Sequence, residues 1–178
     1  MFIKIRYLVY YFLRVKLSRK VFSKGLVLIG KNVKLIAEEN AVITFGQNVV
    51  VKDNTTIYAK KNAKIIIGNN SSTGHSTEIS ANELIEIGND VIMGAHTYIT
   101  DSNHGYSIKD VPIRKQQMEV GQVLIGNNVW LGRNVMLLKG SQLGDATIVA
   151  AGAVVNKSFS QNLVIGGVPA KVIKSTYE

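Results

Sequence analysis

The sequence of 178 residues has no cysteine, two prolines and three histidines. Without cysteine, the chain has no disulfide framework, no thiolate nucleophile and no cysteine-ligated zinc or iron–sulfur site. The scarcity of proline, together with 16 glycines, excludes collagen-like and proline-rich classes. Since hydrophobic residues make up 46% of the chain and charged residues only 19%, we expect one domain with a buried core.

Acidic residues are absent from positions 1–24, which hold seven of the 21 lysines and arginines. The rest of the chain carries 14 basic and 12 acidic side chains and is nearly neutral, whereas the whole chain has a net charge of +9. The excess therefore belongs to a basic and aromatic N-terminal arm, predicted at residues 1–25. Because the folded body is nearly neutral, we expect no nucleic-acid partner.

The arm, MFIKIRYLVYYFLRVKLSRKVFSK, is too polar to cross a membrane. Its longest uncharged run is seven residues, at 7–13, whereas a spanning helix needs about 20. Charges on both sides of this run, and the lack of a small-residue cleavage site, also distinguish it from a signal peptide. Two interpretations stay open: residues 1–24 pack as a helix on the body or a neighbouring subunit, or they contact an anionic membrane surface.

An aliphatic residue recurs at every sixth position near the C-terminus, at Ile125, Leu131, Leu137, Leu143, Val149 and Val155. A small or branched residue follows each of them four positions later, with one exception, Phe159. Shorter runs upstream keep the same register. A period of six fits neither an α-helix nor an alternating strand, but it suits coils of three short strands, about 18 residues each. Stacked coils of this kind bury a continuous core.

The stretch IGNNVWLGRNVMLLKGSQLGDATIVAAGAVV (125–155), followed by GGVPAKVI (166–173), resembles the hexapeptide-repeat acyltransferases, in particular their sugar O-acetyltransferase branch. The resemblance covers roughly residues 26–174. It implies an all-β fold, a left-handed parallel β-helix. We expect a short N-terminal helical arm before it and one protruding loop at 100–122. It also implies a homotrimer that binds acetyl-coenzyme A between subunits. The period alone does not determine the handedness, and crossovers are usually right-handed.

The period fails between Ile99 and Ile125, and His104 lies near the start of this segment. Long irregular segments inside a compact domain are often functional. Acetyl transfer from a thioester to a hydroxyl needs a base, and imidazole titrates close to neutrality. In the family that the sequence resembles, the catalytic histidine occupies the position that matches His104. We therefore predict that His104 is the general base. Asp101 either orients the imidazole or caps a turn, and both interpretations stay open.

Four further residues are candidates for binding the acceptor: His75, Asn103, Tyr106 and Arg114. His75 comes from a coil near the place where the family lines its acceptor pocket. The other three belong to the protruding loop, and Arg114 would suit an acceptor with a phosphate or carboxylate. For each of them the alternative is a purely structural role in a loop or turn. The third histidine, His96, is expected to face solvent in a turn.

Trp130 and Gly132 match positions where the family passes the pantetheine arm of the cofactor along the coil surface. A glycine allows a ligand to approach the backbone, and an apolar ring near a corner suits either a ligand or a subunit contact. The same resemblance implies that five more residues contact the cofactor: Arg133, Ala151, Asn156, Lys157 and Lys171. The two lysines suit the nucleotide phosphates. The family often has a smaller residue at position 133, Thr at 156 and Arg at 171.

Together these features predict an acetyl-coenzyme A-dependent O-acetyltransferase that acts on a sugar hydroxyl, with the sugar free, nucleotide-linked or lipid-linked. We expect it to act in the cytoplasm in surface polysaccharide or lipopolysaccharide biosynthesis. The alternatives are N-acetylation of an amino sugar, a non-catalytic scaffold and a zinc carbonic anhydrase. We expect no metal, because the spacing of the three histidines does not follow the pattern of the zinc enzymes.

Overall fold

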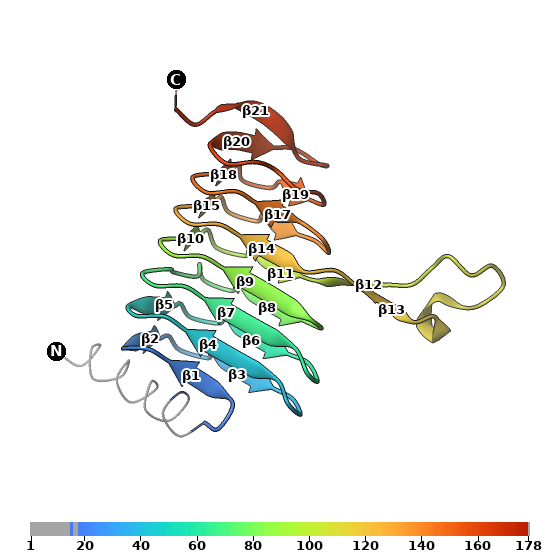
Figure 1. The fold of residues 1–178 in the computed structure, drawn as a ribbon, viewed down its shortest axis with the longest axis horizontal. Coiled ribbons are helices and arrows are strands. Elements are labelled where there is room, and N and C mark those ends of the chain that lie inside the picture. Colours follow the sequence, from blue (N-terminus) through green and yellow to red (C-terminus); the bar gives the residue numbers. More distant parts are fainter. Residues whose placement is uncertain (1–14, 16–17, 178) are drawn as a thin grey trace.

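The computed structural model describes residue 15 and residues 18–177. These residues form a β-helix in which short parallel strands stack in three sheets around a prism (Figure 1). Apart from the β12–β13 and β20–β21 pairs, successive strands lie on different sheets and each pairs with a strand of a neighbouring coil. The all-β, left-handed parallel β-helix expected for this chain is therefore confirmed as its fold class. Residues 1–14 and 16–17 of the expected helical arm lie outside the described residues.

The chain visits the three sheets, here named A, B and C, in that order on every coil. Sheet A contains β1 (Val21–Ser23), β4 (Val42–Phe45), β7 (Lys64–Ile67), β9 (Leu84–Ile87), β14 (Val123–Ile125) and β17 (Gln142–Leu143). Sheet B contains β2 (Val27–Ile29), β5 (Val49–Val51), β10 (Ile92–Met93), β15 (Trp130–Leu131), β18 (Ile148–Val149), β20 (Leu163–Gly166) and β21 (Lys171–Ser175). Sheet C contains β3 (Lys34–Ala37), β6 (Thr56–Ala59), β8 (Glu78–Ala81), β11 (Tyr98–Thr100), β16 (Met136–Leu137) and β19 (Val154–Val155).

The residues at the predicted six-residue spacing line the inside of the prism. All six aliphatic positions from Ile125 to Val155 are buried, with at most 3% of their surface exposed. The residues four positions later are buried as well, including Phe159. The prediction that these side chains form one continuous core is therefore confirmed.

The coils are not all of the predicted length. Leu124 pairs with Gln142 at the predicted spacing, but the step from Val42 to its partner Lys64 is longer. The extra residues lengthen the strands: β6 and β7 have four residues each, whereas β16 and β17 have two. The predicted coil length is thus right for the C-terminal coils and wrong for the N-terminal ones.

Asparagines make many of the corners. Residues 48, 70, 90 and 128, three asparagines and an aspartate, stack at one corner with positive φ angles of 55–57°. Asparagine and aspartate tolerate this left-handed conformation better than other side chains. Their side chains also bond between coils, as Asn48 Nδ2 donates to Asn70 Oδ1 over 3.2 Å. The corner residues therefore both turn the chain and join one coil to the next.

The interruption at residues 100–122 is an ordered hairpin that projects from the edge between sheets C and A (Figure 1). Strands β12 (Ser102–His104) and β13 (Met118–Val120) pair antiparallel, and a short 3₁₀ turn, η2 (Ile113–Lys115), lies near its tip. The buried amide of Gln116 bonds the backbone of Ile108 and Val111, over 2.8–3.1 Å. The protruding loop is thus held in a defined shape by its own hydrogen bonds.

The two ends of the β-helix differ from the expected boundaries. Strand β1 lies inside the segment assigned to the arm, yet Val21 is buried and pairs with Ile43 of β4. The β-helix therefore begins before residue 26. At the other end β21 turns back and pairs antiparallel with β20. Within the described part of the chain, no helix is long and apolar enough to span a membrane.

Candidate functional site

His104 lies on β12, at the base of the hairpin, and its side chain is exposed. It faces Met118 across the antiparallel pair. A pocket of about 370 Å³ opens beside it on the edge of sheet C. The pocket is lined by His104 together with Lys60, Ser80, Tyr98, Thr100, Ser102, Asn103, Met118 and Leu138. A group bound in this pocket would lie next to the imidazole and among several hydroxyl groups.

The base of the hairpin is fastened to the coils on both sides of it. Lys139 Nζ lies 2.6 Å from Glu119 Oε2, which joins β13 to the next coil. The backbone N–H of Gly121 donates to the carbonyl of Asp101 over 2.8 Å, and Gly140 N–H donates to Gly121 O at the same distance. Because β13 carries the pairing partner of His104, these bonds also hold the backbone of His104 in place.

Asp101 is fully buried, and its carboxylate caps a corner of the preceding coil. It accepts hydrogen bonds from the backbone N–H groups of Asn82 (2.7 Å), Glu83 (2.7 Å) and Leu84 (2.9 Å). Both carboxylate oxygens are engaged in this way, and no hydrogen bond between Asp101 and His104 occurs in the described structure. The geometry supports the turn-capping interpretation of Asp101 and not the catalytic one.

Replacing Asp101 with Ala should lower the free energy of unfolding by about 1–3 kcal/mol, because three buried backbone N–H groups lose their acceptor. Chemical denaturation of the purified variant measures this change. The matched control is His104→Ala, which removes an exposed side chain and should change stability by less than about 0.5 kcal/mol. An Asp101→Ala protein with the stability of the wild type would contradict the capping role.

The candidate acceptor residues are not all near the pocket. Asn103 lines it beside His104. Tyr106 and Arg114 are exposed farther out on the hairpin and do not line it. His75 lies at the edge between sheets B and C, where its carbonyl accepts a 2.9 Å hydrogen bond from His96 N–H. Within one chain, therefore, only Asn103 accompanies His104.

The candidate cofactor residues separate into two groups, one on each side of sheet C. Trp130 lies on sheet B, Lys171 on β21 of the same sheet, and Arg133 and Ala151 at the edge between sheets B and C. Asn156 and Lys157 follow β19 at the edge between sheets C and A, the edge that carries the hairpin. One chain does not bring these residues together.

The exposed surfaces of both groups fit parts of coenzyme A. Trp130 is 55% exposed and pairs in register with Ile92, which is 56% exposed, so the two form an uncovered apolar strip. A strip of this kind suits the pantetheine arm. Lys157 and Lys171 are exposed cations, which suit phosphate groups. The chemistry of the residues therefore fits the cofactor expected from the sequence.

The structure explains the glycine at position 132 by the stacking of coils, whereas the sequence predicted a close approach of the cofactor. A Cβ atom at this position would lie 2.6 Å from the backbone nitrogen of Ala151 on the next coil. Side chains do not approach backbone atoms so closely, so the stacking of two coils already requires glycine here. Close approach by a ligand is not needed to explain this glycine.

Gly132→Ala should therefore destabilise the protein by about 3 kcal/mol even without any cofactor, since the coils must move apart. Thermal or chemical unfolding of the cofactor-free protein measures the loss. Gly152→Ala is the matched control, because a Cβ there meets nothing within 4 Å and only the positive φ of 73° is strained, at about 1 kcal/mol. If Gly132→Ala is as stable as the wild type but binds coenzyme A weakly, the stacking role is wrong and Gly132 faces the ligand.

The sequence did not single out four pocket residues that lie outside the hairpin: Lys60, Ser80, Tyr98 and Leu138. Ser80 pairs with Thr100, and Tyr98 lies two residues before Thr100 on the same strand. The register of sheet C therefore brings Ser80 and Tyr98 to the pocket. The alternation along each strand indicates which side chains point outward. Because the coils differ in length, it does not indicate which outward residues of different coils lie side by side. Among the described residues, no group of three histidine, aspartate or glutamate side chains is arranged to hold a metal ion.

Comparison with known proteins matches residues 122–157 to the family described as "Bacterial transferase hexapeptide (six repeats)". Over 152 residues the chain is 34% identical to "Putative lipopolysaccharide biosynthesis O-acetyl transferase WbbJ" of Escherichia coli K12. This match covers 82% of the chain and 66% of WbbJ. The chain spans about two thirds or less of the length of the first curated relatives it matches.

Two solved structures resemble the described fold. The polySia-specific acetyltransferase NeuO has a TM-score of 0.57 and 28% identity, over 88% of this chain and 80% of NeuO. A point mutant of AntD, an N-acyltransferase from Bacillus cereus solved with dTDP and coenzyme A, has a TM-score of 0.72. Its identity is 19%, over 94% of this chain and 87% of AntD, so this likeness concerns the fold alone.

Proposed function

Because the chain belongs to the hexapeptide-repeat transferases, we propose that it transfers an acetyl group from acetyl-coenzyme A to a sugar hydroxyl. The observation that carries this proposal is the pocket at the base of the hairpin, where an imidazole lies beside hydroxyl and amide side chains. Such side chains hydrogen-bond sugars, and an imidazole can accept a hydroxyl proton. The name of WbbJ, an O-acetyl transferase, supports the same reaction class.

In this proposal His104 accepts the proton of the acceptor hydroxyl as the hydroxyl oxygen attacks the thioester carbonyl carbon. The carbon–sulfur bond then breaks, and His104 returns the proton to the departing sulfur. The products are an acetyl ester and the free thiol of coenzyme A. The acetyl group has moved to the sugar oxygen, and the hydroxyl proton has moved to the sulfur. Acetyl-coenzyme A supplies the activated acetyl group. Asn103 and the pocket hydroxyls hold the acceptor, while Trp130 and Lys157 belong to the surfaces that would hold the donor.

The separation of the two cofactor groups supports a site formed between subunits of a homotrimer. In a closed ring the same two surfaces meet at every interface, so the hairpin edge of one subunit can face sheet B of the next. The hairpin exposes Ile108 and Ile113, each 57% exposed, and sheet B exposes Ile92 and Trp130. These apolar side chains are suited to such a contact. Each site would then draw on both groups of cofactor residues.

His104→Ala should reduce acetyl transfer to a sugar about 10²–10⁴-fold, the usual contribution of a general base. The measurement is release of free coenzyme A together with mass detection of the acetylated sugar, over free, nucleotide-linked and lipid-linked sugars. His96→Ala is the matched control, because it removes an exposed histidine on another edge. Turnover of His104→Ala close to that of the wild type would contradict the assignment.

Transfer to the amine of an amino sugar is the second candidate. AntD, which shares the fold, is an N-acyltransferase. The two reactions differ in their products, since an ester is cleaved by mild hydroxylamine and an amide is not. The same mass-detected assay therefore separates them when the acetylated sugar is treated with hydroxylamine.

We also propose a cytoplasmic role in making surface polysaccharide or lipopolysaccharide, with the basic and aromatic N-terminal arm in contact with an anionic membrane surface. Its charge excess and aromatic residues support the idea. Deletion of residues 1–14 leaves the β-strands of the described residues intact and removes three of the arm's seven cations and five of its six aromatic residues. It should therefore weaken sedimentation with anionic vesicles at low salt. Neutral vesicles are the control. Undiminished vesicle binding after the deletion would leave packing on the protein as the arm's role.

A further inference from the structure

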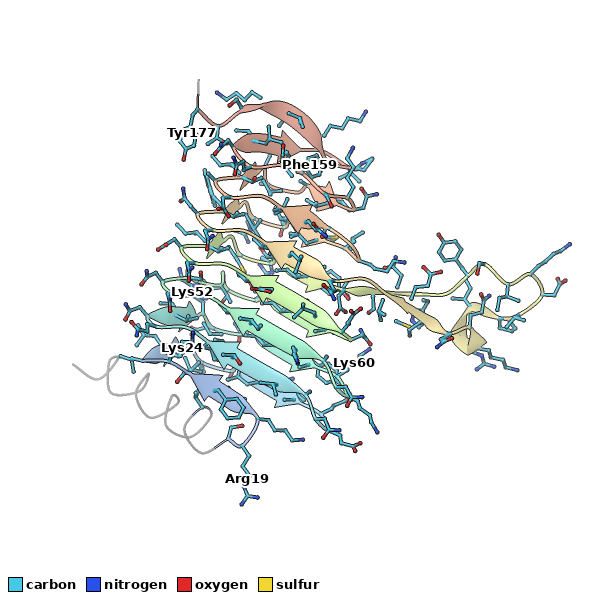
Figure 2. The ribbon with its side chains drawn as sticks, in the orientation of Figure 1. Arg19, Lys24, Lys52, Lys60, Phe159 and Tyr177 are labelled. Carbon is cyan, nitrogen blue, oxygen red and sulfur yellow. The ribbon has the colours of Figure 1, made fainter. Side chains whose placement is uncertain are left out.

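The pocket beside His104 carries positive charge and no negative charge. Its nine lining residues include Lys60 and His104 but no aspartate or glutamate. Lys60 comes from a coil far upstream in the sequence, directly after β6. It lies on the side of the β-helix from which the hairpin projects (Figure 2). A ligand in the pocket would therefore be placed between a permanent cation and the proposed base.

The ammonium group of Lys60 has no ion-pair partner among the described residues, although its backbone is fixed. Lys60 N–H donates to Ala81 O over 2.9 Å, which holds the residue at the corner, and its side chain is half-buried. The ion pairs formed by the described residues join Lys61 to Glu39 and Lys139 to Glu119. Lys60 thus has a fixed backbone and an ammonium group that forms no ion pair with the described residues.

The carboxylate of Glu38, on which the charge of Lys60 acts, is already engaged. Glu38 accepts hydrogen bonds from the hydroxyl of Tyr58 and from Lys61 N–H, the latter over 2.9 Å. Its pKa is lowered chiefly by the bond from Tyr58, then by the Lys61 backbone, with a smaller contribution from the charge of Lys60. Glu38 therefore lies within the field of Lys60 but directs its oxygens to other donors.

We propose that Lys60 binds an anionic group of the acceptor, so that the acceptor is an acidic sugar, either a sugar acid or a sugar phosphate. The inference rests on the proposed function and names its substrate class. A half-buried lysine gains most from an anion that replaces lost water contacts. Ser80, Thr100 and Ser102 offer hydroxyls for the rest of the ring. The anion at Lys60 would then hold one ring hydroxyl against His104.

The test compares neutral sugars with anionic sugars of the same ring configuration. The full-length protein, saturated with coenzyme A, is titrated with methyl glycosides of galactose and glucose and of their uronic acids, and with galactose 1-phosphate as the phosphate arm. We expect the wild type to bind at least one anion about tenfold more tightly than its neutral partner. Lys60→Met should reduce this preference about tenfold. Lys61→Met, whose lysine is paired with Glu39 outside the pocket, is the matched control and should keep it.

Two results would overturn the inference: no preference of the wild type for any of these anions, or a preference that survives Lys60→Met. Acetyl transfer to the same sugars is measured separately. Transfer to a neutral sugar without any anion preference would refute the role of Lys60 and leave the proposed function intact. No transfer to any sugar, together with retained anion binding, would refute the acetyltransferase assignment instead.

Discussion

The structure depends on the repeated stacking of aliphatic side chains inside a parallel prism. Each coil buries one set of such side chains against the coils above and below, and its backbone bonds to the same neighbours. The few polar side chains inside, such as Thr55 and Ser71, bond to neighbouring coils. No buried side-chain nitrogen or oxygen of the described residues lacks a partner. Stability therefore arises locally, coil by coil, and needs no contact from the outer surface.

This arrangement explains how the chain accommodates the hairpin as an insertion. Ile87 pairs with Ile125, although the whole hairpin lies between them in the sequence, because the hairpin leaves and returns at one corner. The coil closes as if the hairpin were absent. The hairpin can then project a histidine beyond the prism while Asp101 and Lys139 fasten its base. The solenoid thus obtains a pocket beside a histidine at the point where its repeat is interrupted.

The sequence predicted the inward positions and the location of His104, because both follow from the six-residue pattern and its interruption. It did not predict that Lys60 would share a pocket with His104, since longer coils of unequal length precede the regular ones. The sequence alone also did not decide between the two roles of Asp101 or explain why residue 132 is a glycine. Those depend on whether a side chain points toward a backbone amide or a neighbouring coil, which only the stacked structure shows.

The central claim is that the hairpin histidine meets the thioester in a crevice to which both groups of cofactor residues contribute. A crystal structure of the protein with coenzyme A tests it directly. The account predicts that the sulfur lies in the pocket at the hairpin base, about 3–4 Å from where a hydroxyl bonded to His104 would be. Trp130 and Lys157 from adjoining subunits would flank the bound molecule. A sulfur bound on another face, with His104 open to solvent, would contradict the account.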